Sequence, residues 1–141
     1  MAEQALQGGF ISTGGVNRGA QTFEGPKQVN LVRRIEHYTA SATLTKEESG
    51  KVCTNLGASG AVTLTLPQDA PAGCEFPFVV MAAQELRVDP GAAGAVYING
   101  AKQTDDKYIS ADDEGESIVL VADGNGDWAS RATNGTWSVE A

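Results

Sequence analysis

Short β-prone runs, each ended by turn-forming residues, fill the chain from Tyr38 onward. The clearest run covers residues 61–66, where Val62, Leu64 and Leu66 alternate with two threonines. A period of two places apolar side chains on one face of a strand and hydroxyl groups on the other. Pro67 ends the run because proline cannot donate to a sheet ladder. We expect further strands at residues 38–45, 51–55, 76–81, 85–88, 95–98, 108–110, 117–122, 128–132 and 136–139.

The spacing of these runs predicts the fold class. Turn signals recur roughly every 8–12 residues, which is typical of sandwiches and barrels, and 17 glycines among 141 residues favour many turns. We therefore predict an all-β fold: one small sandwich or barrel-like antiparallel domain with an extended N-terminal arm. The turn formers at 55–60 predict a hairpin between runs 51–55 and 61–66. The nearly continuous apolar run 117–121 predicts a central strand covered on both faces.

The N-terminal arm is predicted from sparse apolar residues. Residues 1–35 show no helical or strand period, and glycine and amide residues separate their apolar side chains. Such a segment cannot bury enough surface to offset its ordering entropy by itself. We expect an arm at 1–35 that orders on a neighbouring subunit, and a body at 36–141; a solvated tail is the alternative. The expected contact residues are Phe10, Ile11, Phe23, Val29, Leu31, Arg33, Arg34 and Tyr38.

Charge differs between the first 51 residues and the rest of the chain. Residues 1–51 carry six basic and five acidic groups, a net of +1, and the remaining residues carry four basic and thirteen acidic groups, a net of −9. With −8 overall, nucleic acid and anionic membranes are disfavoured partners. No apolar run approaches the ~20 residues that span a bilayer. The first residues have neither the basic start nor the apolar core of a secretion signal, so we expect synthesis and retention in a cytoplasm.

The sequence contains no complete pattern for a metal or cofactor site. Cys53 and Cys74 lack the spacing of a zinc site and the chain has one histidine, so we expect two semi-buried thiols, with a disulfide or a reactive role as alternatives. Residues 123–127 begin like a calcium loop, but Trp128 and Asn134 occupy the positions of the required glycine and glutamate. A hairpin turn explains the same residues. We predict no metal and no other cofactor.

Catalysis is also not expected. The acidic residues at 105–116 lie in polar loops, which favours a solvated surface over the paired carboxylates of a glycosidase. His37 is accompanied by no nucleophile motif. An enzyme would depend on Asp112 or Glu114. Trp128 and Trp137 are expected to pack in the core, on facing strands of a hairpin turned at residues 134–135, with sugar stacking as the alternative.

The body resembles a β-module of tailed-phage virion proteins, especially the head-decoration or cement proteins. The resemblance covers about residues 38–137 and is carried by GKVCTN at 50–55, GAVTLTLP at 60–67, the connection 70–73, LRVDP at 86–90, and 117–128 ending in ADGNGDW. It implies a capsid decoration protein that binds the major capsid protein on the outer surface of the virion, commonly as a homotrimer with extended termini. A receptor- or glycan-binding module of a tail fibre is the alternative.

Overall fold

The computed structural model describes residues 32–141 of the chain. Within them, one compact unit extends from Arg33 to Ala141, whereas the predicted body starts at residue 36. Five of the predicted contact residues lie outside the described part: Phe10, Ile11, Phe23, Val29 and Leu31.

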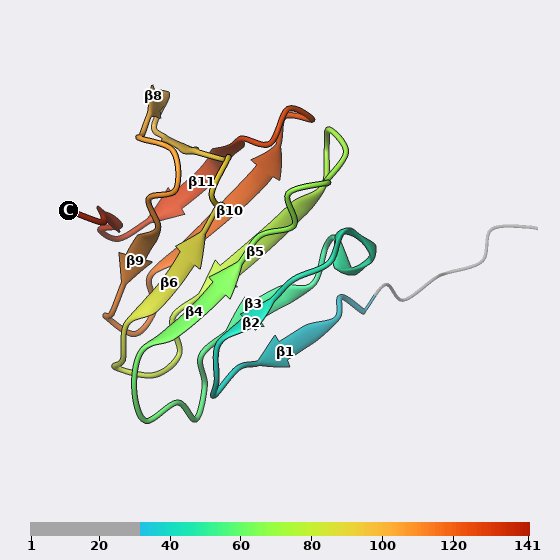
Figure 1. Ribbon diagram of the computed structural model, residues 1–141. Coiled ribbons are helices and arrows are strands. Elements are labelled where there is room, and N and C mark those ends of the chain that lie inside the picture. Colours follow the sequence, from blue (N-terminus) through green and yellow to red (C-terminus); the bar gives the residue numbers. More distant parts are fainter. Residues whose placement is uncertain (1–31) are drawn as a thin grey trace, which may run out of the picture. The chain divides into compact units, whose positions relative to one another are not determined.

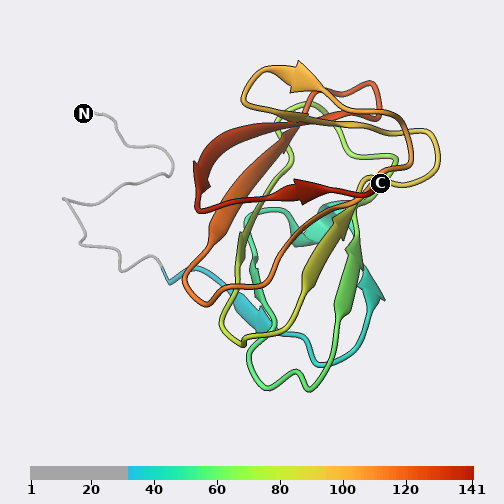
Figure 2. The same cartoon turned by 90° about the vertical axis from the view of Figure 1, so that its left-hand side faces the viewer.

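The compact unit is a sandwich of two β-sheets, and the predicted all-β fold is confirmed (Figures 1 and 2). Sheet A has the order β1 (Ile35–His37), β3 (Val52–Thr54), β5 (Glu75–Val79), β10 (Ser117–Ala122), β11 (Trp128–Asn134), β7 (Val96–Ile98) and β8 (Ala101–Lys102). Sheet B has the order β12 (Ser138–Val139), β9 (Ile109–Ala111), β6 (Leu86–Asp89), β4 (Val62–Thr65) and β2 (Ala42–Thr43).

The first six strands wind alternately through the two sheets. Strands β1, β3 and β5 are parallel neighbours in sheet A, and β2, β4 and β6 are parallel neighbours in sheet B. Of the ten strand pairings in the described residues, five are parallel, so the sheets are mixed rather than purely antiparallel as predicted. A period of two shows which face of a strand is buried, but it does not identify the neighbouring strand.

The same winding corrects the predicted hairpin between residues 51–55 and 61–66. Strand β3 lies in sheet A and β4 lies in sheet B, so the loop between them crosses from one layer to the other. Asn55 holds this crossing, because its buried side chain bonds to the backbone of the neighbouring β5–β6 loop. Turn-forming residues do occupy this loop, but they connect two layers and not two neighbouring strands.

The second half of the chain contains the antiparallel strand pairs of both sheets. Strands β10 and β11 form a hairpin around residues 123–127, as predicted, and Gly124 and Gly126 adopt φ values of 89° and 97°. One carboxylate oxygen of Asp123 accepts the N–H groups of Asn125 and Asp127 at 2.7 and 3.2 Å. The hairpin predicted at residues 134–135 is wrong, because β12 crosses to sheet B and pairs with β9.

Alternating side chains from both sheets form the core. Strand β10 is central in sheet A, as predicted, and its Ile118 and Leu120 are buried between the layers. Its outward residues Val119 and Val121 are only half-buried, so the expected cover of both faces is incomplete in this chain. The largest fully buried side chains are Trp128, Phe76, Phe78, Leu44, Leu64, Leu66, Leu86, Ile109, Ile118, Leu120, Val62 and Val80.

Replacing Gly94 with alanine is expected to lower the free energy of unfolding by about 2 kcal/mol, the cost typical of overpacking. A Cβ at Gly94 would lie 2.4 Å from the carbonyl oxygen of Gly126 and 2.7 Å from that of Pro90, and backbone atoms cannot easily move away. Gly60→Ala is the matched control, because nothing lies within 4 Å of its Cβ position. Urea unfolding of both variants measures the effect; equal stabilities would contradict it.

Candidate interaction site at the open end of the sandwich

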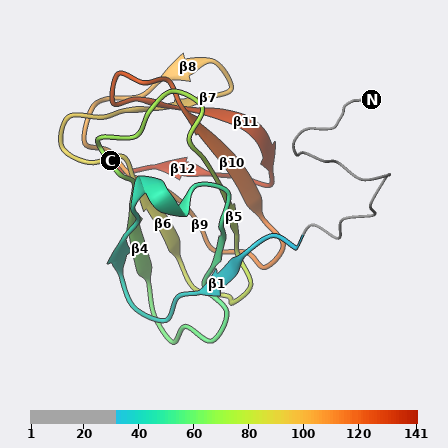
Figure 3. The same ribbon diagram turned by 90° about the vertical axis from the view of Figure 1, so that its right-hand side faces the viewer.

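Strand β1 is an edge strand of sheet A, and β2 is an edge strand of sheet B. These two edge strands lie at the same end of the sandwich (Figure 3). Strand β1 uses every second residue to bond β3: Val52 N–H donates to Arg34 O, and Tyr38 N–H donates to Thr54 O, each at 2.8 Å. In a parallel ladder the alternate residues, Ile35 and His37, then direct their backbone groups to the open side. Such an edge can template the addition of a strand.

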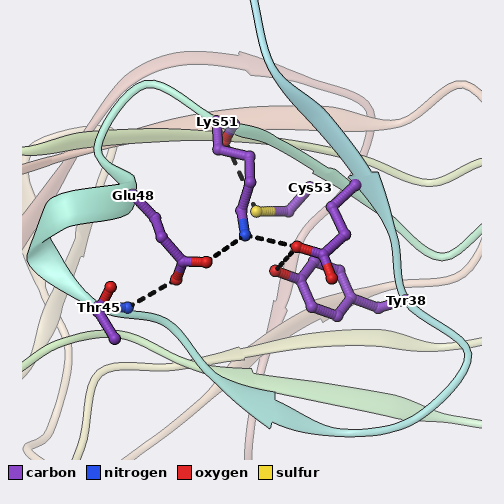
Figure 4. A network of polar contacts seen from close by, with 6 residues as sticks. Tyr38, Thr45, Glu48, Lys51 and Cys53 are labelled. Carbon is purple, nitrogen blue, oxygen red and sulfur yellow. Dashed lines mark hydrogen bonds and ion pairs between the residues drawn. The ribbon is translucent and has the colours of Figure 1, made fainter.

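A charged network covers the end of the core beneath this edge (Figure 4). The Lys51 side chain is only 5% exposed, and its Nζ donates to Glu36 Oε1 and Glu48 Oε2, both at 2.6 Å. The hydroxyl of Tyr38 donates to the same Glu36 oxygen at 3.0 Å. Glu36 is paired in register with the buried Cys53, so the network lies where a further turn of the winding would place apolar side chains.

Local structure places the second carboxylate of this network. The short 3-10 helix η2 (Lys46–Glu48) folds Glu48 back, so that its Oε1 accepts the N–H of Thr45 at 2.9 Å. The chain then turns at Gly50, with φ at 92°, and the Lys51 N–H donates to Glu48 O at 3.0 Å. These contacts bring Glu48 and Lys51 together before β3 begins.

The network holds its groups in fixed protonation states. Hydrogen bonds from Lys51 lower the pKa of both Glu36 and Glu48 below the usual 4.5. Burial alone would lower the pKa of Lys51, but its bonds to the two glutamates outweigh this effect and raise its pKa above 10.5. Burial raises the pKa of the Tyr38 hydroxyl and of the Cys53 thiol to about 12 in each case. Neither group is ionised near neutral pH, so this arrangement suits structural support and not nucleophilic chemistry.

The predicted contact residues in the described part lie at this end. Arg33 and Arg34 are exposed; Arg33 Nη1 donates to Gly50 O at 3.2 Å, and neither arginine forms an ion pair with a described carboxylate. Tyr38 differs, because only 8% of the residue is exposed and it belongs to the core. Tyr38 directly follows β1, which forms the expected edge, and its side chain supports that edge from inside. The contact roles themselves stay predictions.

The network of Glu36, Glu48 and Lys51 was not predicted from the sequence. A signal for one member was present, because Lys51 and the apolar Cys53 are two residues apart in a predicted strand and therefore share a face. Lys51 is accordingly buried, with 4% of the residue exposed. Its partner Glu36 comes from the parallel neighbour β1, which no local pattern indicates.

The two tryptophans and the acidic residues at 112–116 have structural roles in the described domain. Trp128 and Trp137 are buried, as expected, and do not offer a ring face for sugar stacking. Side-chain oxygens of Asp112, Asp113 and Glu116 lie within 4.8 Å of one another. The two Glu116 oxygens, however, accept the N–H groups of Thr136 and Asp113 at 2.7 and 3.1 Å, as in an ordinary polar loop.

No protein-family model matches the chain, and no curated protein matches it in sequence. Among the described residues, no helix has the length and apolar character needed to cross a bilayer.

Proposed function

We propose that this protein is a capsid decoration protein of a tailed phage, which binds the major capsid protein on the outer surface of the assembled head and stabilises it. The proposal is supported by the open edge at β1, where residues 1–31 join the described domain. Two exposed arginines lie at this edge of an otherwise acidic body. The edge and the arm together offer hydrogen-bonding, cationic and apolar groups to a partner protein.

The physical role is one of linkage. A protein that binds only the assembled lattice stabilises that lattice by mass action. A homotrimer that engages several capsid subunits gains effective affinity from multivalency, even where each contact is weak. The partners in this proposal are the major capsid protein and further copies of the chain, with no role for nucleic acid or membrane. The acidic loops point to solvent and keep the decorated particle soluble.

Deleting residues 2–31 is expected to reduce binding to capsids by at least about tenfold, because the arms of one oligomer each add to its multivalent affinity. The measurement is co-sedimentation of the purified variant with expanded capsids that lack the protein, scored as copies bound per capsomer. Arg33→Ala/Arg34→Ala tests the cationic edge separately, with Arg131→Ala as its matched control because Arg131 already pairs with Glu75 at 2.6 Å. Unchanged binding of the deletion variant would remove the arm from the mechanism.

The glycan-binding alternative is not favoured by the site. A glycan site here would use Trp128, Trp137 and the nearby loops, and both tryptophans are buried. A glycan array with the purified protein distinguishes the two functions, since a decoration protein gives no specific signal.

A further inference from the structure

The outer faces of the two sheets differ in chemistry. In sheet B the outward residues of the three parallel strands and of β9 are polar: Thr43, Thr63, Thr65, Arg87, Asp89 and Ser110. A polar face of this kind is normally exposed to water. In sheet A, six outward residues of β1, β3, β5 and β10 are apolar: Ile35, Val52, Pro77, Val79, Val119 and Val121. The outward residues His37, Glu75 and Ser117 on the same strands are polar.

Register joins these apolar residues into a continuous row across sheet A. Ile35 is paired with Val52, and Pro77 is paired with Val119, which is paired with Ala132. Val52 lies beside Pro77, because each comes one residue before the paired Cys53 and Phe78 on parallel strands. The row therefore crosses five neighbouring strands. Ile35 is 53% exposed, and the other large members remain half-buried.

Charge is scarce along this face. The outward carboxylate of Glu75 is paired with Arg131 at 2.6 Å, and the other outward residues of β5 and β10 are Pro77, Val79, Ser117, Val119 and Val121. The acidic excess of the chain lies elsewhere, for example in the exposed loop at Asp112, Asp113 and Glu114.

These properties indicate which partner fits the face. A strongly charged partner would need unpaired charges of the opposite sign, and the apolar row provides none. Two copies of a chain with a net charge of −8 repel each other over most of their surface. They can approach closely where both surfaces are apolar and their charges are already paired, and the outer face of sheet A meets this condition.

We propose that the outer face of sheet A is the surface through which copies of this chain associate. Two identical faces can pack on each other around a two-fold axis, and three can face a common three-fold axis; either arrangement is closed. The inference depends on the contrast between the two sheets and not on the capsid role. Capsid binding and self-association are measured separately, so each proposal can fail alone.

The test is the mass of the full-length protein, measured by light scattering across a wide concentration series. The wild type is expected to be an oligomer, and Val119→Glu and Val119→Lys are each expected to be monomeric, because like charges would then meet in the row. An equal mixture of the two variants is expected to associate again, which a misfolded protein would not do. Thr63→Glu places the same charge on the polar face of sheet B and is expected to leave the oligomer intact.

Two results would overturn the proposal: a monomeric wild type, or an oligomer that survives Val119→Glu unchanged. Circular dichroism checks that each variant is folded. If Val119→Glu does not fold, Val52→Glu carries the same charge at the other end of the row, near the edge of the sheet, and has the same expected result.

Discussion

Replacing Asn55 with alanine is expected to lower the free energy of unfolding by about 3–4 kcal/mol, measured by urea titration. Asn55 is fully buried. Its side-chain oxygen accepts the N–H groups of Met81 and Ala82 at 2.8 and 3.0 Å, and its amide donates to the carbonyl oxygens of Gln84 and Ala82 at 2.9 and 3.3 Å. Alanine leaves these backbone groups without their partner, and the loop between β5 and β6 loses its attachment to the loop after β3.

Two further variants show whether the hydrogen bonds cause this effect. Asn55→Asp keeps the two accepted bonds and loses the two donated bonds, so its stability should fall below that of the wild type. Asn125→Ala removes an exposed asparagine side chain from the β10–β11 turn and should change stability by less than about 0.5 kcal/mol. A loss below about 1 kcal/mol for Asn55→Ala would indicate that water replaces the amide at little cost.

Replacing Lys51 with alanine should cost about 2–3 kcal/mol of unfolding free energy. Removing one member of a buried ion pair usually costs about 3–5 kcal/mol, but the side chains of Glu36 and Glu48 are 51% and 30% exposed and can be rehydrated in part. Alanine also opens space beside Tyr38, whose ring lies 5.4 Å from Lys51 Nζ. Urea titration near neutral pH measures the loss.

Controls and pH separate charge from packing at Lys51. Lys51→Met keeps most of the volume, and Lys46→Ala tests an exposed pair with Asp69, where less than about 0.5 kcal/mol is expected. The pKa of the glutamates is lowered on folding, so their contribution is present above pH 4.5 and is lost as the pH falls through their folded pKa. The pKa of Lys51 is raised, so its contribution is present below pH 10.5 and is lost as the pH rises through its folded pKa.

The stability difference between wild type and Lys51→Met should therefore be largest between pH 4.5 and 10.5 and should shrink in acid. A difference that stays constant well below pH 4.5 would show that packing alone accounts for Lys51.

The sequence predicted the positions of the strands far better than it predicted which strands pair with each other. The alternation of Val62 and Leu64 with threonine identifies β4 and its buried face, and β10 matches residues 117–122. The parallel winding could not be predicted in this way, because the residues that hold it, such as Asn55, look like ordinary turn formers in the sequence. Pairings such as Cys53 with Phe78 also join residues far apart in the chain.

The candidate sites were likewise predicted in part. Arg33, Arg34 and the edge near Tyr38 were predicted from the change in composition, and they lie at an open edge of sheet A. The apolar run at 117–121 predicted a strand covered on both faces, but Val119 and Val121 remain half-buried. The sequence indicated that these residues belong in an interior, and the folded domain covers only one side of their strand. That difference motivates the proposed contact between copies.

The winding of β1 to β6 also sets how the protein can change in length. One turn spans 17 residues from Ile35 to its neighbour Val52, and another spans 25 from Cys53 to Phe78. Because each turn contacts chiefly the turns beside it, an added turn at the β1 end would lengthen the domain without disturbing β9 to β12. Lys51 and Glu36 oppose such growth, since an extra turn would enclose their charges. A lengthened descendant would first have to exchange this pair for apolar residues and re-create it at the new end.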